Sequence, residues 1–264
     1  RLATGQRPIP PLPDDPFAPL PAYSPGMLTD PIVLAGKSDS LEYPVQISTD
    51  GILVDDPESP DDVVSRVRDV FEAIWRERAD DIESEACKIL GVSDLRDYFR
   101  DPKLFFEYHI KQYSRSRRKA PIYWLLQSPR RSYGVWLYYH RLNKDTLFKV
   151  LAMHVEPKIR LEQARLDQMR TQRKELGAGG SEAKRMERAI DRHEALMSDL
   201  HTFRDRLSRA AELYLEPDLD DGVVLNMAPL GELVPWKEPG VYWEALRRGE
   251  YAWSGVAKQL ARKG

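Results

Sequence analysis

The sequence predicts a mainly α-helical protein with a small β-hairpin or sheet, an α+β fold organised around a long antiparallel helical hairpin. Two long segments of helical periodicity, residues 143–176 and 181–215, are separated by only four small residues. Two short runs rich in aromatic and β-branched residues, 121–128 and 133–140, flank a turn. The first 44 residues hold ten of the twenty prolines, which excludes regular helix or central strand there.

The composition indicates a folded protein of a reducing compartment. A chain of 264 residues with 42% hydrophobic content can bury a sizeable core. Cys87 is the single cysteine, which excludes an internal disulfide and a Cys-rich zinc site. The apolar runs are far shorter than the roughly 20 residues of a membrane helix, so we expect a cytoplasmic protein without a membrane partner. The chain begins at Arg1 instead of Met, and we expect it to be a piece of a longer protein.

The positions of proline, glycine and helix-capping residues divide the chain into four segments. Residues 1–58 are predicted to be a proline-rich extended arm, whose apolar residues favour packing on a body or a partner. Residues 59–143 are predicted to form a helical subdomain with the β-hairpin and a basic loop. In this segment Ser59 is expected to cap a first helix, Gly91 to end a second over 82–90, and Asp101 to begin a third.

Residues 144–215 are predicted to form the antiparallel helical hairpin, with Asn143 and Ser181 as the helix caps. Pro157 lies inside the first helix and is expected to kink it. The second helix has apolar positions at alternating three- and four-residue steps, which is typical of a coiled-coil seam. Residues 216–264 are predicted to form a short strand at 223–226 and an aromatic cap of short helices.

A concentration of positive charge is the strongest functional signal. Between residues 111 and 149 there are ten basic residues against one acid, Asp145. Lysine and arginine clustered in this way neutralise phosphates and release counterions from DNA. The residues that we predict to bind double-stranded DNA are Lys111, Arg115, Arg117, Arg118, Lys119, Arg130, Arg131 and Arg141.

Each of these patterns also has a structural interpretation. The net charge of −2 leaves open that the basic stretch is a solvated face balanced by acids elsewhere. Arg130 and Arg131 occupy a turn that could enter a groove of DNA, but turn tips are commonly charged for solubility. The aromatic residues of 121–140 could stack on unpaired bases, although their alternation with Ile, Leu and Val favours core packing.

No catalytic or metal site is predicted. The five histidines lack the spacing of a metal pair, and Asp218, Asp220 and Asp221 before Gly222 favour a turn over a calcium loop. The phosphate-binding loop, the dinucleotide fingerprint and the nucleophile elbow are absent. No cofactor is therefore expected in this chain.

Two blocks carry a family resemblance: residues 118–128 (RKAPIYWLLQS) with 135–141 (VWLYYHR), and residues 219–226 (LDDGVVLN) with 234–237 (VPWK). They resemble the C-terminal region of large bacterial adenine-specific DNA methyltransferases, of the type IIG restriction-modification kind and of the DISARM and BREX phage-defence systems. The family's catalytic Asn-Pro-Pro-aromatic motif and its glycine loop for S-adenosylmethionine are absent, so no catalytic residue is carried over.

The resemblance implies that the whole protein methylates adenine in host DNA and binds S-adenosylmethionine in an upstream domain. This chain is then expected to be a non-catalytic module that engages DNA and acts as a scaffold for the rest of the methyltransferase. The alternative is a protein-interaction module, in which the helical hairpin and the arm dock another defence-system subunit or a second copy. This alternative predicts an apolar stripe exposed on the long helices.

Overall fold

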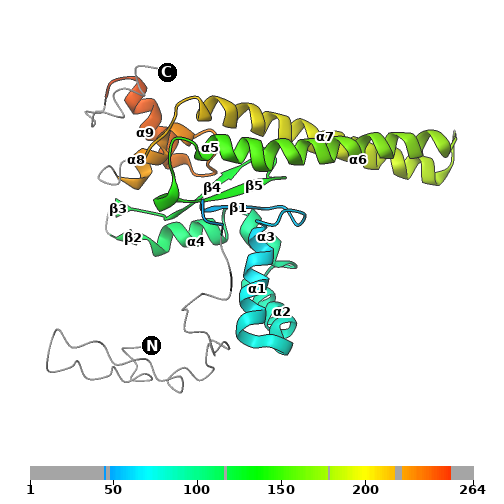
Figure 1. Ribbon diagram of the computed structural model, residues 1–264, viewed down its shortest axis with the longest axis horizontal. Helices are drawn as coiled ribbons and strands as arrows, with labels where there is room; N and C mark the ends of the chain where they lie inside the picture. The colour runs from blue at the N-terminus through cyan, green and yellow to red at the C-terminus, as the bar shows by residue number, and fades with distance from the viewer. Residues whose placement is uncertain (1–44, 46–47, 116–117, 178, 218–221, 251–264) are drawn as a thin grey trace. The chain divides into compact units, whose positions relative to one another are not determined.

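The computed structural model describes residue 45 and residues 48–115, 118–177, 179–217 and 222–250. Residues 45–264 belong to one compact unit, and residues 1–44, most of the predicted arm, lie outside the described residues. Figure 1 shows the arrangement of the elements. The helices are α1 (Val63–Trp75), α2 (Ala79–Leu90), α3 (Leu95–Arg100), α4 (Phe105–Gln112), α5 (Thr146–Lys149), α6 (Glu156–Glu175), α7 (Ser181–Ala211), α8 (Val223–Met227) and α9 (Lys237–Arg247).

The strands form two small antiparallel sheets. Strands β1 (Ile52–Val54), β5 (Gly134–Tyr138) and β4 (Tyr123–Gln127) lie in the order β1-β5-β4, and β2 (Ser114–Arg115) pairs with β3 (Arg118–Lys119). The predicted β-hairpin is confirmed, with Leu125 opposite Trp136. The predicted boundary of the arm at residue 58 is wrong, because β1 belongs to the folded unit and pairs with β5. Its residues Ile52 and Val54 are fully buried, whereas prolines are concentrated before residue 45.

The first helices differ from the prediction in their caps. Asp62, not Ser59, caps α1, and its carboxylate accepts a hydrogen bond of 2.9 Å from the Ser65 backbone N–H. Helix α2 ends as predicted at Gly91, which adopts a positive φ of 71°. Helix α3 was not predicted, and α4 begins at Phe105, four residues after Asp101.

The antiparallel helical hairpin is confirmed. Figure 1 shows α6 and α7 side by side, and Arg170 and Arg173 of α6 pair with Glu194 and Glu187 of α7 in reversed order. Pro157, which was expected to kink the first helix, lies in the first turn of α6, directly after a π-helical turn, Val150–Val155. Proline has no N–H to donate to the preceding turn.

The hydrophobic core of the hairpin lies in the half of α7 nearer the sheet. The buried apolar side chains of that half are Met197, Leu200, Phe203, Leu207, Ala210 and Ala211. Further along, toward the connection at residues 176–180, ion pairs bridge the two helices. Apolar burial also continues there, since Ala183 is 2% exposed and Ile190 packs partly buried against the core, but fewer apolar side chains of α7 are buried than near the sheet. The coiled-coil seam that the sequence pattern indicated stays a prediction.

The tail of the chain differs from the prediction in one element. Residues 223–226, predicted as a strand, belong to helix α8, because Leu225 and Asn226 donate backbone hydrogen bonds to the Gly222 carbonyl. Burial of Val224 and Met227 outweighs the preference of β-branched residues for strands. Helices α8 and α9 form part of the predicted cap, whereas Tyr251 and Trp253 lie outside the described residues. None of the described helices combines the length and apolar character needed to cross a membrane.

Candidate nucleic-acid interface

The predicted DNA-binding residues are distributed over several short elements. Lys111 lies exposed near the end of α4. Arg115 and Arg118 are opposite one another in the β2–β3 pair, and Lys119 follows in β3 with a half-buried side chain. Arg117 lies between the two strands and outside the described residues. The described part of the densest basic block is thus the β2–β3 pair, which follows directly after α4.

The β4–β5 turn carries two of the remaining arginines, both exposed. Arg131 adopts a positive φ of 59°, and the backbone N–H of Arg130 donates a 2.8 Å hydrogen bond to Asp199 of α7. Asp199 also accepts from the Ser132 hydroxyl. Burial raises the pKa of Asp199, but hydrogen bonds from Ser128, Ser132 and the turn backbone outweigh that effect and leave the pKa below its usual value. Asp199 therefore remains charged and holds the turn on α7.

A groove collects three of these predicted residues, Lys111, Lys119 and Arg131. It has a volume of about 620 Å³. We call it the basic groove, and its lining residues are Pro102, Lys103, Phe106, Glu107, Ile110, Lys111, Ser114, Lys119, Arg131, Pro235 and Trp236. Four cations from three separate parts of the chain thus surround a wall made of phenylalanine, isoleucine, proline and tryptophan.

Lys119 is held in place on one side of the basic groove. Its ammonium nitrogen lies 5.6 Å from the ring centroid of Trp236 and forms an ion pair with Glu238 at the start of α9. A cation over an indole is attracted by the electron-rich face of the neutral ring. Lys119 therefore favours this position of the Trp236 indole, and its own charge is largely balanced by Glu238.

The other cations of the basic groove have weak or exchangeable partners. Lys111 forms an exposed ion pair of 2.6 Å with Glu107, one helical turn earlier. Arg131 lies 3.5 Å from Asp101, at the long end of a hydrogen bond. Exposed pairs of this kind contribute at most about 1 kcal/mol. A bound phosphate can therefore replace either carboxylate at little cost.

His109 fixes the helix that forms the floor of the basic groove. Its Nε2 accepts a 3.0 Å hydrogen bond from the backbone N–H of Tyr123, which ties α4 to β4. Burial lowers the pKa of His109 to about 4. The imidazole is therefore neutral at pH 7 and acts as a structural acceptor.

Comparison with known proteins gives this interface a context. No protein-family model matches the chain. Over 201 residues, 70% of this chain and 16% of the relative, it is 32% identical to the adenine-specific methyltransferase BrxX of Escherichia coli O9:H4 (strain HS). Over 135 residues, 51% of this chain and 11% of the relative, it is 26% identical to the adenine-specific methyltransferase PglX of Lacticaseibacillus casei (strain Zhang). The chain is a homologue of one part of these methyltransferases.

The predicted resemblance to adenine-specific methyltransferases is therefore confirmed, over a limited part of the relatives. The chain spans less than a fifth of the length of either protein. Within the part of this methyltransferase homologue that the structure describes, no group of three His, Cys, Asp or Glu side chains is arranged to hold a metal ion.

Two important residues of the basic groove were not predicted as site residues. Lys103 precedes α4 and lies outside the basic stretch that begins at residue 111, and Trp236 was assigned to the aromatic cap. The tail reaches α4 only through tertiary packing, for which the sequence carries no local signal. Conversely, Arg130 and Arg141 are exposed but do not line the groove.

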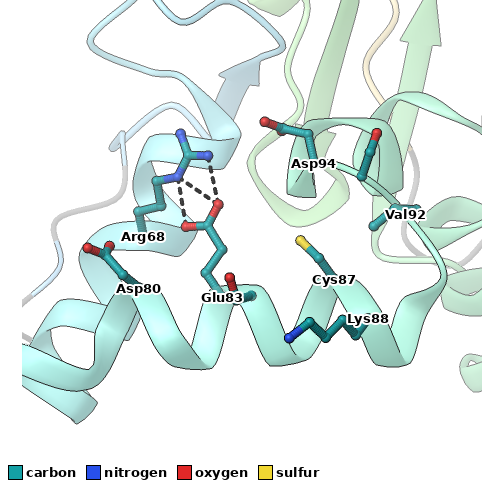
Figure 2. Close-up of a pocket in the computed structure, with 9 residues that line it drawn as sticks. Arg68, Asp80, Glu83, Cys87, Lys88, Val92 and Asp94 are labelled. Carbon is teal, nitrogen blue, oxygen red and sulfur yellow. Dashed lines mark hydrogen bonds and ion pairs between the residues drawn. The ribbon is translucent and has the colours of Figure 1, made fainter.

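A second cavity, of about 530 Å³, lies beside α2 and is lined by side chains of both charges. Figure 2 shows the sulfur of Cys87 pointing toward the space near Glu83 and Asp94. Glu83 is already paired with Arg68, whose Nε and Nη2 donate hydrogen bonds of 2.7–3.1 Å to its carboxylate. Burial, followed by the nearby Glu83 and Asp94 charges, raises the pKa of Cys87. The thiol therefore stays protonated and is a poor nucleophile at neutral pH.

Proposed function

We propose that this chain is a non-catalytic DNA-engaging and scaffolding module of an adenine-specific DNA methyltransferase, with the basic groove as its contact to DNA. The convergence of Lys103, Lys111, Lys119 and Arg131 on one groove supports the proposal most strongly. Binding of S-adenosylmethionine and transfer of the methyl group would belong to the rest of the protein. The module would hold DNA in position for that reaction.

The electrostatics of the basic groove suit the phosphate backbone. Lys103 and Lys111 are exposed, and Arg131 has only a distant carboxylate partner. Each phosphate that such a cation neutralises releases counterions, so affinity falls with salt by a slope of about 0.9 per contact. Contacts of this kind position DNA without reading its sequence.

The folded helices support the scaffolding part of the proposal. The turn that presents Arg131 is anchored on α7 through Asp199, and Lys158 of α6 pairs with Asp56 beside the sheet. The sheet and the long helical hairpin are therefore connected by buried polar contacts. Such a frame would keep the basic groove at a fixed place relative to the hairpin.

A salt titration of binding to duplex DNA tests the proposal. We expect the triple variant Lys103→Ala, Lys111→Ala, Arg131→Ala to lower the salt slope by about 2.7, since three contacts are removed, for every duplex sequence tried. The matched control replaces three exposed cations of α7, Lys184, Arg188 and Arg192, with alanine. If both triple variants change affinity and slope equally, the basic groove is not the DNA contact.

A second candidate function is docking of a protein partner, and one observation favours it. Met153 and Leu161 are 62% and 39% exposed and lie eight residues apart, with Pro157 between them on the same face of the π-helical turn and α6. This is a short form of the apolar stripe that the alternative predicts. Replacing Met153 and Leu161 with glutamate should then abolish binding of another methyltransferase segment or of a second copy, measured by light scattering.

A further inference from the structure

The basic groove has an apolar wall that contact with a duplex backbone does not require. Ile110, Pro235 and Trp236 are only half-buried and line the same space as Lys103, Lys111 and Arg131. In a duplex the base rings are stacked inside, and the backbone presents phosphate and sugar to the protein. A ligand that uses both parts of this groove must therefore carry a phosphate next to an exposed apolar ring.

We propose that the basic groove holds an unpaired nucleotide of a DNA strand, with its base against Pro235 and Trp236 and its phosphates at Lys103, Lys111 and Arg131. This inference rests on the proposed function and specifies the form of DNA that the site prefers. Proteins that bind single strands combine a positively charged groove with aromatic side chains on which bases stack. Both features are present here on one surface.

The geometry provides a prepared aromatic surface. The Lys119 ammonium lies 5.6 Å from the Trp236 centroid and is itself held by Glu238, so the indole is fixed before a ligand arrives. Fixing the ring in advance lowers the entropic cost of binding. The volume of about 620 Å³ lies within the range of sites for small organic ligands and leaves space for a base with its sugar and phosphate.

The cations are placed for the phosphates of the same nucleotide. Lys103 and Lys111 lie on either side of Glu107 in sequence, two residues before α4 and near its end, and Arg131 comes from the β4–β5 turn. The exposed Lys111–Glu107 pair and the distant Arg131–Asp101 pair can exchange for a phosphate. The base and the phosphate thus have separate, neighbouring partners.

The test compares the affinity of the whole chain for a short oligothymidylate with its affinity for a duplex of the same length at equal salt. We expect Trp236→Leu to weaken oligothymidylate binding about tenfold while duplex binding changes little, because stacking of one base is lost. The matched control is Trp243→Leu, on α9 but outside the groove lining. Unfolding in urea shows whether either variant has lost its fold.

A measurement on the unsubstituted side chain decides the matter if Trp236→Leu fails to fold. In protein labelled with 5-fluorotryptophan, the Trp236 signal is assigned from Trp236→Phe, and the buried Trp124 and Trp136 serve as internal references. Oligothymidylate should shift the Trp236 signal alone. The inference is overturned if oligothymidylate does not shift this signal while the chain binds duplex DNA with a salt slope that the triple variant lowers as expected above. The proposed function then stands.

Two further outcomes also count against the inference. A chain that binds neither form of DNA overturns both the inference and the proposed function. Thymidine monophosphate that competes as effectively as the oligothymidylate shows that the groove takes a free nucleotide, and the assignment to a DNA strand is then wrong. If the mononucleotide binds weakly and the oligonucleotide binds strongly, the inference is supported, because neighbouring phosphates contribute to affinity.

Discussion

The carboxylate of Asp62 receives two hydrogen bonds from the guanidinium of Arg96, one on each oxygen and each 2.8 Å long. Asp62 is fully buried and also caps α1, and Arg96 continues to Asp55 at 2.6 Å. A bidentate pair of this kind is stronger and more directional than a single contact. One carboxylate therefore connects the start of α1, the helix α3 and the segment that follows β1.

We expect Asp62→Asn to destabilise the protein by about 3 kcal/mol, because the guanidinium of Arg96 loses its main partner in a poorly hydrated place. The free energy of unfolding in urea measures the effect. Asp69→Asn is the control, since Asp69 forms a partly exposed pair with Arg66. That control should cost less than about 1 kcal/mol. Equal losses in the two variants would show that the Asp62–Arg96 pair contributes nothing beyond a surface pair.

His109 should make stability depend on pH. Its pKa is about 4 in the folded protein, whereas the unfolded chain has the ordinary value of 6.5. Below pH 6.5 the unfolded state binds the proton first, so the stability present above pH 6.5 is lost as the pH falls toward 4. The loss is about 3 kcal/mol, from 1.36 kcal/mol for each unit of pKa difference. The difference in unfolding free energy between the protein and His109→Gln, measured at pH 7 and pH 4, isolates this contribution. A constant difference would contradict the neutral, buried imidazole.

Lys158 should be essential for docking the helical hairpin. Its ammonium lies 2.9 Å from Asp56 and 2.8 Å from Glu162, and the side chain is only 12% exposed. Removing the ammonium leaves two poorly hydrated carboxylates, so we expect Lys158→Met to cost about 3–5 kcal/mol in urea unfolding. Arg160→Met, an exposed neighbour on α6, should change stability by less than about 0.5 kcal/mol.

The contribution of the Lys158 pairs can be separated from that of its apolar stem. In the double variant Lys158→Met, Glu162→Leu the two losses should not add, because Glu162 has already lost the Lys158 ammonium in the single variant and keeps Arg165 and His193 as partners. If the double variant is less stable than Lys158→Met by the full cost of Glu162→Leu alone, the two residues do not interact.

Gly51 occupies a position where a side chain is not accommodated. Its φ is +73°, and a Cβ atom there would lie 2.9 Å from the Cβ of Tyr138 and 3.0 Å from that of Arg141. We expect Gly51→Ala to lower the free energy of unfolding, measured by thermal denaturation, by about 2 kcal/mol or more, because of backbone strain and the close contact. Gly240→Ala is the matched control, because nothing lies within 4 Å of its Cβ and the residue is inside α9. That control should be neutral or stabilising by up to about 1 kcal/mol.

The sequence predicts elements whose signal is local and long. Helix α7 begins at Ser181, which was predicted to be its N-cap although Gly180 takes that position. The β4–β5 pair lies within the predicted runs, since periodicity over many residues averages out exceptions. Short elements were missed. Helix α3 has six residues and β1 has three, and each depends on partners far along the chain. The helix at residues 223–227 replaced a predicted strand because its side chains pack on the core.

The candidate interface was predictable to the extent that its charges are contiguous in sequence. Lys111 and Lys119 stand in the basic stretch, and Arg131 in the turn that the hairpin pattern indicated. Lys103 and Trp236 come from separate segments, and only the packing of the tail beside α4 brings them to the same groove. A local sequence pattern cannot predict such a contact between distant segments.

The uneven distribution of the core along α6 and α7 has a consequence for their motion. Toward the connection the helices are joined by exposed pairs such as Arg170–Glu194 and Arg173–Glu187, each contributing little. Near the sheet, Leu200, Phe203 and Leu207 are fully buried. Backbone amides of the outer turns should therefore exchange with deuterium through local fraying, and those of the inner turns only when the whole unit opens. The helical hairpin would then be rigid near the sheet, and its outer turns would be able to adjust to a molecule that binds them.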